Sequence, residues 1–288
     1  MRNTVAGSGQ EKIYQMVTDR IIALMESGVI PWRKTWGDTK PPANYVSKNE
    51  YRGINTFMLN AAMYQSRYWM SFKQIGEAGG RVKKGEKGFP VIFWKRLEIS
   101  SDEDGIKKIR LLRYYTVFNL NQCEGINIPD APRNRDIRPI DAGRRIIEGM
   151  PNKPRMEHGR SISAYSSAKD VIFMPDMESF QEAEEYYSTL FHEMIHSTGH
   201  ESRLNRFREE NDNHMFGSET YSKEELVAEM GSAFLCAESG ISHHVIENQA
   251  AYLSAWLEKL RNDNRLLIQA ASKAQKAADY ILNRKYEN

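Results

Sequence analysis

The chain has 288 residues, of which 40% are hydrophobic and 27% charged, a balance typical of a folded globular protein rather than a disordered one. It contains no run of about 18 apolar residues, so we expect no membrane-spanning helix and no membrane partner. The first residues lack the apolar stretch of a secretion signal, and two distant cysteines, Cys123 and Cys236, make no disulfide framework. We therefore expect a cytoplasmic protein.

Charge is distributed unevenly along the chain. Residues 1–125 contain 20 Lys and Arg against 12 Asp and Glu, a net charge of +8, whereas residues 126–288 contain 20 against 26, a net charge of −6. Because 288 residues are ample for two domains, this asymmetry indicates two domains with different partners. The basic half is a candidate for binding a polyanion, unless the charges are merely scattered unevenly.

The first half predicts helices followed by strands. Apolar residues at helical spacing indicate a helix over about residues 10–27. A second helix should start near Asn55, and Ser71 is a suitable cap for a third over residues 72–78. After a turn rich in Gly and Lys, residues 90–99 and 106–120 are β-rich runs joined by a polar loop, which predicts two strands.

The segment of residues 128–140 concentrates proline and charge without periodicity, and we interpret it as a linker. This places one domain at residues 1–127 and a second at residues 141–288. Both domains are predicted to be α+β.

The second half predicts a helical domain with a small sheet. Its expected elements, in chain order, are a short helix over 144–150, two strands around a turn at 166–169, a helix ending near Gly199, a helix starting near Ser222 and a helical tail over about 245–282. Ser179 and Glu182 have the spacing of a capping box before the helix that ends near Gly199.

A metal-binding motif lies on that helix, where residues 192–196 read His-Glu-Met-Ile-His. A spacing of four places His192 and His196 on one helical face, so both can bind a single divalent ion. Glu193 can take a proton from a water activated by the ion, and we assign it as general base. The alternative is a pair of ordinary surface histidines.

A catalytic zinc needs a third protein ligand. In metzincins a histidine follows the helix-ending glycine by three residues, but position 202 is Ser202 and His200 is out of register. In gluzincins a glutamate comes from a downstream helix, with a polar residue four positions on that orients a ligand histidine. Glu225 and Glu229 resemble that pattern, so we assign Glu225 as ligand and Glu229 as the orienting residue.

One alternative exchanges these two glutamates. Ser222 and Glu225 also have capping-box spacing, and a Glu225 turned toward its own helix start would leave Glu229 as the ligand. In either case the donor set is two imidazoles and a carboxylate. We expect one divalent ion, with zinc as the first choice, and the same ligands also suit manganese or cobalt.

The segment of residues 162–175, just before the metal-binding helix, resembles the zincin edge strand, along which an extended peptide can add as a further strand. A protein substrate is therefore expected. Tyr165 and Asp170 in this segment are more often structural than catalytic. His243 and His244 are candidates for stabilising an oxyanion, although a histidine pair on a loop is usually just solvated.

The basic half also contains four of the five tryptophans, interleaved with Lys and Arg. Cations can follow a phosphate backbone while aromatic rings stack on exposed bases, which favours single strands over duplex. Of the aromatic residues, we expect Trp69, Phe93 and Trp94 to lie in the core. Candidate nucleic-acid-binding residues are Arg33, Lys34, Trp36, Tyr51, Arg52, Asn55, Lys73, Lys83, Lys84 and Lys87.

Several longer segments resemble one family, the ArdC-type antirestriction proteins of conjugative plasmids, which are related to the N-terminal regions of TraC-type primases. In the first half they are residues 51–55 and 72–88, and in the second half residues 186–206, 221–235 and 252–260. The resemblance covers nearly the whole chain. It implies an N-terminal domain that binds single-stranded DNA, a C-terminal zincin-like (gluzincin) metalloprotease domain, and a role in protecting incoming plasmid DNA from restriction.

Three readings of the function follow. The first is a metalloprotein that accompanies single-stranded plasmid DNA and evades restriction. The second is a regulatory zinc-dependent metallopeptidase that cleaves a host protein, with DNA as a tether. The third is a DNA-coating protein whose metal is purely structural. Replacement of Glu193 distinguishes them, because only a catalytic role needs that carboxylate.

Overall fold

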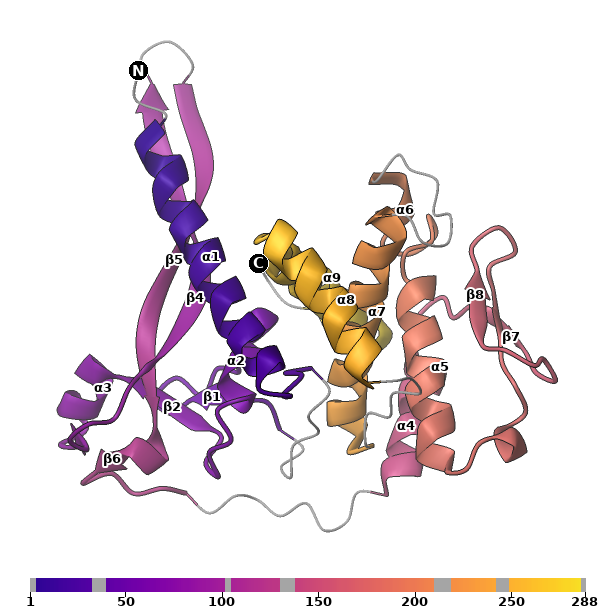
Figure 1. Cartoon of the computed structure of the whole chain (residues 1–288), viewed down its shortest axis with the longest axis horizontal. Coiled ribbons are helices and arrows are strands. Elements are labelled where there is room, and N and C mark those ends of the chain that lie inside the picture. Colours follow the sequence, from indigo (N-terminus) through magenta and orange to yellow (C-terminus); the bar gives the residue numbers. More distant parts are fainter. Residues whose placement is uncertain are drawn as a thin grey trace. The chain divides into compact units, whose positions relative to one another are not determined.

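The computed structural model describes residues 4–32, 40–101, 105–129, 138–209, 219–241 and 249–285. They form two compact units of mixed α+β structure, which confirms the predicted fold class (Figure 1). Unit 1 comprises Met1–Val29, Pro41–Ala131 and Ala255–Arg265, and unit 2 comprises Ile30–Lys40, Pro132–Ser254 and Leu266–Asn288. Among the described helices, none has the length and hydropathy to cross a bilayer.

Unit 1 is built on a four-stranded sheet. Its elements are α1 (Thr4–Glu26), β1 (Ala43–Asn44), α2 (Ile54–Asn60), β2 (Tyr68–Ser71), α3 (Phe72–Glu77), β3 (Arg81–Val82), β4 (Phe89–Ser101), β5 (Gly105–Asn119) and β6 (Cys123–Glu124). The sheet order is β1-β2-β5-β4, in which only β1 and β2 are parallel, and β3 pairs separately with β6.

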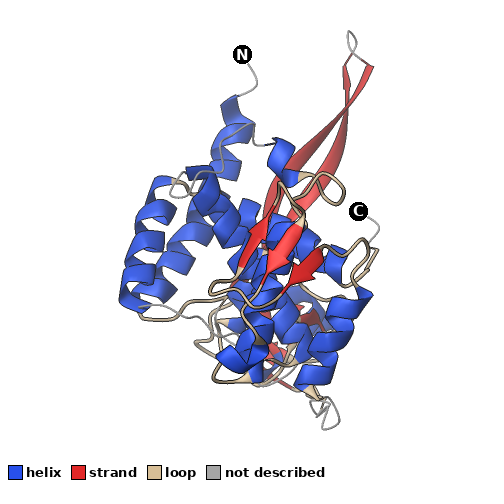
Figure 2. Ribbon diagram, turned by 90° about the vertical axis from the view of Figure 1, so that its right-hand side faces the viewer, coloured by secondary structure: helices blue, strands red, loops and turns tan. Residues whose placement is uncertain are grey.

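The β4–β5 hairpin is much longer than the strands beside it. It pairs from Phe89 opposite Val117 to Ser101 opposite Gly105, whereas β2 pairs only with Val117–Asn119. Most of the hairpin therefore extends past the rest of its sheet, as the long red strands in Figure 2 show.

Local sequence signals account for α3. The side chain of Ser71 accepts a hydrogen bond from the backbone N–H of Gln74, and the side chain of Gln74 accepts one from the N–H of Ser71. This reciprocal cap satisfies two backbone donors at the helix start. It confirms the cap predicted at Ser71.

The core of unit 1 lies on both faces of the sheet near β2. One cluster contains Leu59, Trp69, Val91 and Val117, and the other is formed by Met70, Ile75, Leu120 and Cys123. Trp69 is buried, as predicted. The two clusters use alternate residues of the strands, as expected for a sheet covered on both faces.

Unit 1 also includes residues 255–265, a segment from far along the chain. The domain boundaries predicted from the sequence place this segment in the second domain, residues 141–288. This segment contains most of α8 (Gln249–Asn262) and contacts α1 through polar groups. Thr18 Oγ1 donates to the carbonyl of Asn264 at 2.8 Å, and Asn264 Nδ2 donates to Glu11 Oε1 at 2.7 Å. The Arg265 guanidinium lies 2.8 Å from Glu11 Oε2.

Unit 2 combines a small sheet with packed helices. Its elements are α4 (Pro139–Gly149), β7 (Arg155–Glu157), β8 (Ala164–Ser166), β9 (Val171–Phe173), α5 (Ala183–Ser197), α6 (Arg206–Glu209), α7 (Glu219–Ser239) and α9 (Leu266–Ile281). In the sheet, of order β7-β9-β8, the edge strand β8 runs antiparallel to β9. Helix α7 packs against both α5 and α9.

One predicted feature of unit 2, the helix cap at Ser179 and Glu182, is wrong. Helix α5 begins at Ala183 after Glu182, whose side chain makes no capping hydrogen bond, and Ser179 ends a separate 3₁₀ turn. The capping-box spacing therefore does not mark this helix start. The predicted helical tail is present as two helices, α8 and α9, which residues 263–265 separate.

Candidate functional site

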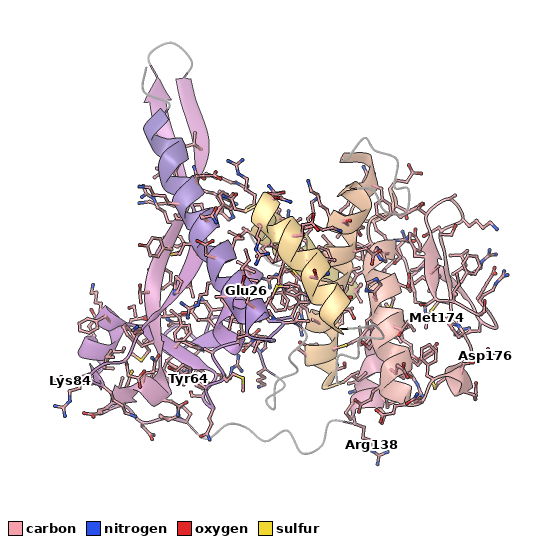
Figure 3. The ribbon with its side chains drawn as sticks, in the orientation of Figure 1. Glu26, Tyr64, Lys84, Arg138, Met174 and Asp176 are labelled. Carbon is pink, nitrogen blue, oxygen red and sulfur yellow. The ribbon has the colours of Figure 1, made fainter. Side chains whose placement is uncertain are left out.

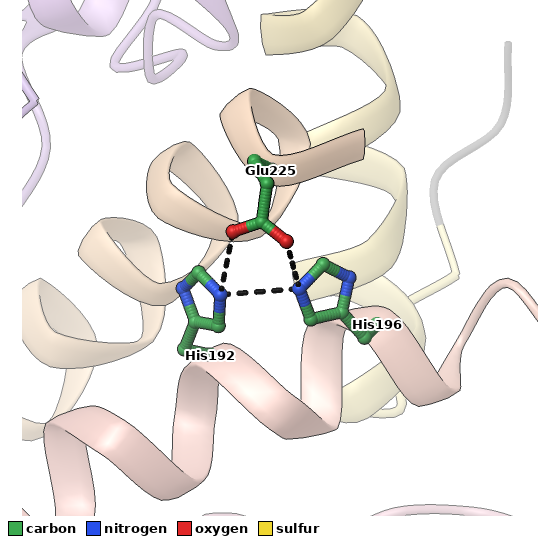
Figure 4. Close-up of side chains that lie close together, drawn as sticks. All are labelled: His192, His196 and Glu225. Carbon is green, nitrogen blue, oxygen red and sulfur yellow. Dashed lines mark hydrogen bonds and ion pairs between the residues drawn. The ribbon is translucent and has the colours of Figure 1, made fainter. Parts of the chain in front are cut away.

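Three side chains from two helices of unit 2 meet at one point (Figure 4). His192 and His196 lie one turn apart on α5, and their Nε2 atoms are 3.1 Å apart. Glu225 reaches them from α7, with Oε2 3.3 Å from His192 Nε2 and Oε1 3.3 Å from His196 Nε2. The structure thus brings together all three residues predicted as metal ligands.

A glycine permits the close helix contact behind this arrangement. A Cβ atom on Gly231 of α7 would lie 2.6 Å from Cδ1 and 2.8 Å from Cγ1 of Ile195, closer than real carbon atoms approach. Ile195 precedes His196, and Gly231 lies six residues, about 9 Å of helix, beyond Glu225. The absent side chain therefore lets α7 approach α5 closely enough for Glu225 to reach both histidines.

The distances fit a single ion. Zinc bonds of about 2.0–2.1 Å in tetrahedral geometry place ligand atoms about 3.3–3.4 Å apart. An octahedral ion with similar bonds places adjacent ligand atoms about 2.9 Å apart. The separations of 3.1–3.3 Å between the ligand atoms lie between these values, so the site accommodates either geometry.

The electrostatics of the site also favour a cation. Burial alone would lower the pKa of His196, but the carboxylates of Glu224 and Glu225 outweigh burial and raise it to about 10. Burial likewise opposes the raised pKa of His192, which results mainly from its hydrogen bond with Glu225. Burial would raise the pKa of Glu225, but its two histidine partners hold it well below its usual range. These carboxylates therefore stabilise positive charge at the point where the ligands converge.

A buried ion pair lies behind His196 and was missed at the sequence level. Oε1 of Glu224 is 3.4 Å from His196 Nδ1 and accepts a hydrogen bond of 2.5 Å from Arg206. Arg206 also donates to Thr198 Oγ1 at 2.5 Å and to the carbonyl of Ile195 at 3.0 Å. Glu224 and Arg206 are each only 5% exposed. This network connects α6, α7 and the end of α5.

The orienting role assigned to Glu229 stays a prediction. Glu229 lies one turn beyond Glu225 on α7, and the carboxylate at Nδ1 of His196 belongs to Glu224. Helix α7 begins at Glu219, so Ser222 and Glu225 lie inside it rather than at its start. The alternative in which Glu225 caps its own helix is therefore wrong.

The three ligands line a cavity of about 390 Å³ together with Glu193. Glu193 is 7% exposed, and it follows His192 on α5. Strand β8 and its neighbours form another wall through Ser163, Ala164, Tyr165 and Ser167. The predicted edge strand therefore borders the predicted metal site. His243 and His244 lie outside the described residues.

A second polar cluster fixes the turn after β8. Asp170 has a φ of 48° in this turn, and its carboxylate accepts hydrogen bonds from Tyr165 and from both terminal nitrogens of Arg203. The side chain of Arg203 is fully buried and also donates to the carbonyl of Ser197 at 2.7 Å. Tyr165 and Asp170 thus have the structural role expected of them, since they tie the β8–β9 turn to the end of α5.

The described residues among those predicted to bind nucleic acid lie on several different elements of unit 1. Arg33, Lys34 and Trp36 lie outside the described residues. Tyr51 is 8% exposed in the core, so its ring is not accessible for stacking. The side-chain amide of Asn55 donates to the carbonyl of Ile92 and accepts from its N–H, both at 2.8 Å. Asn55 therefore secures the edge strand β4.

The remaining predicted cations are spread over several elements of unit 1. Arg52 is half-buried just before α2. Lys73 on α3 is exposed and lies 3.6 Å from Glu77, and Lys83 Nζ donates to the carbonyl of Asn121. Lys84 and Lys87 are exposed in the turn after β3, from which Lys84 extends outward (Figure 3). Their nucleic-acid role stays a prediction.

Two aromatic residues expected in the core are instead on the surface. Trp94 is 46% exposed and Phe93 is 41% exposed, both on β4. Tyr114 and Tyr115 on β5, not considered as nucleic-acid contacts at the sequence level, are 52% and 40% exposed. These rings lie beyond the part of the hairpin that pairs with β2.

Comparison with known proteins agrees with this architecture. Residues 11–118 match the family described as the N-terminal domain of anti-restriction factor ArdC. Residues 150–273 match the family described as zincin-like metallopeptidase. The second match contains all three converging ligands.

Whole-chain relatives extend these matches. A Sinorhizobium fredii protein named uncharacterized protein y4eC is 35% identical and covers 93% of this chain and 91% of its own length. A DNA primase TraC of Escherichia coli is 33% identical over 95% of this chain, which spans only 27% of the primase.

Solved structures give the same assignment. The metal-free crystal structure of the antirestriction ArdC protein from the R388 plasmid is 37% identical, with a TM-score of 0.75 over 95% of this chain and 99% of that one. Its Mn(II)-bound structure is 36% identical, with the same TM-score over 94% and 97% of the two chains. The chain therefore belongs to the ArdC family of antirestriction proteins, with an ArdC N-terminal domain followed by a zincin-like metallopeptidase domain.

Proposed function

We propose that this protein binds single-stranded DNA through its first unit and carries a metal-dependent peptidase site in its second, and that the two together protect incoming plasmid DNA from restriction. The convergence of His192, His196 and Glu225 beside Glu193 in one cavity carries the proposal. We assign the DNA-binding domain to residues 1–127, a linker to 128–140 and the peptidase domain to 141–288. Although it falls in the range 141–288, the segment of residues 255–265 belongs to the first compact unit.

Each residue of the site has a defined task in this proposal. A divalent ion, when bound by His192, His196 and Glu225, supplies a Lewis acid and increases the acidity of water. Glu193 accepts the proton from the attacking water and can return it to the leaving amine. Glu224 and Arg206 hold the ring of His196 in its ligating orientation.

The edge strand supplies the means of binding a substrate. Within the part of the chain that the structure describes, strand β8 pairs only with β9, so its other edge can pair with an extended peptide. Because residues 163–165 and 167 line the same cavity as the ligands, a peptide added there would pass the metal site. An extended, accessible stretch of a protein is therefore the proposed substrate class.

The choice of metal rests on the donors and on one relative. Two imidazoles and a carboxylate suit zinc, manganese and cobalt. The ArdC protein of the R388 plasmid has been solved with Mn(II), so we propose manganese beside zinc as the ion of this chain.

Replacement of Glu193 by glutamine tests the proposal. We expect Glu193→Gln to retain one divalent ion per chain and to lose proteolysis of unfolded protein substrates and protection of plasmid DNA in a restriction-proficient recipient. Glu201→Gln, an exposed glutamate just beyond α5, is the matched control.

Other outcomes would separate the remaining functions. Full protection of DNA by Glu193→Gln would exclude proteolysis from the antirestriction role. Loss of the fold after chelation, without any proteolysis by the wild type, would instead support a DNA-coating protein with a structural metal. Loss of proteolysis with unchanged protection would support a separate regulatory protease.

A further inference from the structure

The middle of the β4–β5 hairpin, residues 92–97 and 109–115, is here named the hairpin shaft. Its pairing register gives each face of the ribbon two aromatic rings and two cations. One face carries Phe93, Lys95, Arg113 and Tyr115, and the other carries Trp94, Arg96, Arg110 and Tyr114. Ile92 and Leu112, which share the second face, are buried, but the four rings and the four cations are exposed, so both faces present rings and cations to solvent.

The rings of the shaft are unusually accessible. All four aromatic residues of the shaft are 40–52% exposed. Phe93 and Tyr115 lie diagonally across the two strands with ring centroids 5.7 Å apart, so they support each other while remaining in contact with solvent. Exposed aromatic groups gathered on one element indicate an interaction surface.

The charge of the shaft is entirely positive. It contains four cations and no carboxylate. None of the four makes an ion pair with a side chain that the structure describes, in contrast to Arg81, which pairs with Glu124 at 2.8 Å. Arg96 lies directly opposite Arg110 across the ribbon. Like charges in that position destabilise a strand pair, and a neighbouring polyanion would remove the repulsion.

We propose that the hairpin shaft is the track on which this protein binds single-stranded DNA. This inference rests on the DNA-binding part of the proposed function and adds the location of the site. Phosphates would contact the four cations while bases stack on the aromatic rings. Duplex DNA fits less well, because its bases are stacked on each other and offer no open faces to the rings.

The test measures binding of a fluorescein-labelled 30-nucleotide oligothymidylate to the full-length protein by anisotropy, over a range of salt concentrations. Two double variants remove the rings on one face each, Trp94→Leu with Tyr114→Leu and Phe93→Leu with Tyr115→Leu. If a ring stacks on a base, its removal should lower the affinity for the oligonucleotide by about 5-fold to 150-fold. At least one double variant should show such a loss.

A charge variant, Arg96→Gln with Arg110→Gln, tests the phosphate contacts. Each cation contributes about 0.7 to the slope of log affinity against log salt on a single strand, so the slope should decrease by about 1.4. The matched controls are Phe72→Leu, whose ring is 69% exposed on α3, and Arg81→Gln, whose cation is paired. Both controls should bind as the wild type does.

Crosslinking gives a measurement that does not depend on variants folding correctly. Irradiation of the wild type with 5-iododeoxyuridine-substituted oligonucleotide should attach DNA to peptides that contain residues 92–97 or 109–115. Crosslinks only elsewhere, unchanged affinity in the ring and charge variants, or tighter binding of duplex would overturn the shaft as the track. Absence of any DNA binding by the wild type would instead refute the proposed function itself.

Discussion

Replacement of Glu224 by glutamine tests whether the Glu224 carboxylate positions the metal ligand His196. In Glu224→Gln the side-chain volume is retained, but the charge that faces Nδ1 of His196 at 3.4 Å is lost. Removing such a partner of a metal-bound histidine typically weakens metal binding about 10-fold to 100-fold, which corresponds to about 1.4–2.7 kcal/mol. We therefore expect the zinc affinity of Glu224→Gln to decrease by about 10-fold to 100-fold relative to the wild type.

The same substitution also breaks a buried ion pair. Arg206 would lose its carboxylate partner while its side chain remains almost fully buried, and an uncompensated buried charge costs about 3–5 kcal/mol of folding stability. Arg206→Gln separates the two effects, because it removes the cation and leaves the Glu224 carboxylate next to His196. It should lower stability with less loss of metal affinity than Glu224→Gln.

Zinc affinity is measured by competition with a chromophoric chelator at a temperature where circular dichroism shows every variant to be folded. Stability is measured by urea denaturation of the metal-free proteins. Wild-type zinc affinity in folded Glu224→Gln would show that the contact with His196 has no positioning role. Equal losses of affinity in both variants would show that the network acts only through stability.

Three further predictions concern packing, pH and the metal. Gly231→Ala should weaken zinc binding and lower the free energy of unfolding by up to about 2 kcal/mol. Overpacking against Ile195 costs about 1–3 kcal/mol, and the higher helix propensity of alanine offsets about 1 kcal/mol of this cost. Unchanged zinc titrations would contradict the role of Gly231 in the close contact between α5 and α7. Burial opposes ionisation of Asp170, but hydrogen bonds from Arg203 and Tyr165 hold the pKa of this carboxyl below its usual range. The ionised carboxylate therefore stabilises the fold above about pH 4, and this stabilisation is lost as the pH falls through the lowered pKa. Asp170→Asn should therefore melt below the wild type at pH 7 and approach it at pH 3, and a constant difference between the two melting temperatures would contradict this. Zinc at 100 times its dissociation constant should raise the free energy of unfolding by about 2.7 kcal/mol in the wild type and not in His192→Ala, as thermal melts with and without chelator can show.

The parts of the site that follow from local geometry could be predicted from the sequence. A spacing of four on a helix determines that His192 and His196 share a face, whatever the rest of the fold does. Glu225 needed more, because a contact between two helices depends on how closely they pack. Its assignment came from a resemblance, and the close approach at Gly231 gives the physical reason.

Glu224 and the exposed rings could not be predicted in the same way. Neighbouring residues on a helix point about 100° apart, so only tertiary packing decides that Glu224 faces Nδ1 of His196 while Glu225 faces the Nε2 atoms. Phe93 and Trp94 lie in a strand whose apolar residues resemble a core pattern. Their exposure results from the shortness of β2, a long-range property that the strand itself does not encode.

The interruption of the helical tail could not be predicted for a related reason. The apolar pattern is helical on both sides of residues 263–265, and the polar sequence between them allows either a continuous helix or a break. The break is stabilised by contacts with a distant helix. Asn264 bonds to Glu11 and Thr18 of α1, and the periodicity of the tail contains no information about these partners.

That distant contact has a consequence for the order in which the protein is made. Helix α1 is synthesised first, yet residues 255–265, which belong to the same compact unit, leave the ribosome only after the whole metal-binding region. At about 5–20 residues per second, the interval between residues 131 and 255 lasts about 6–25 s. During this time the nascent first unit lacks the partner of Glu11 and Thr18, so this unit cannot be completed before the residues that form the metal site have been translated.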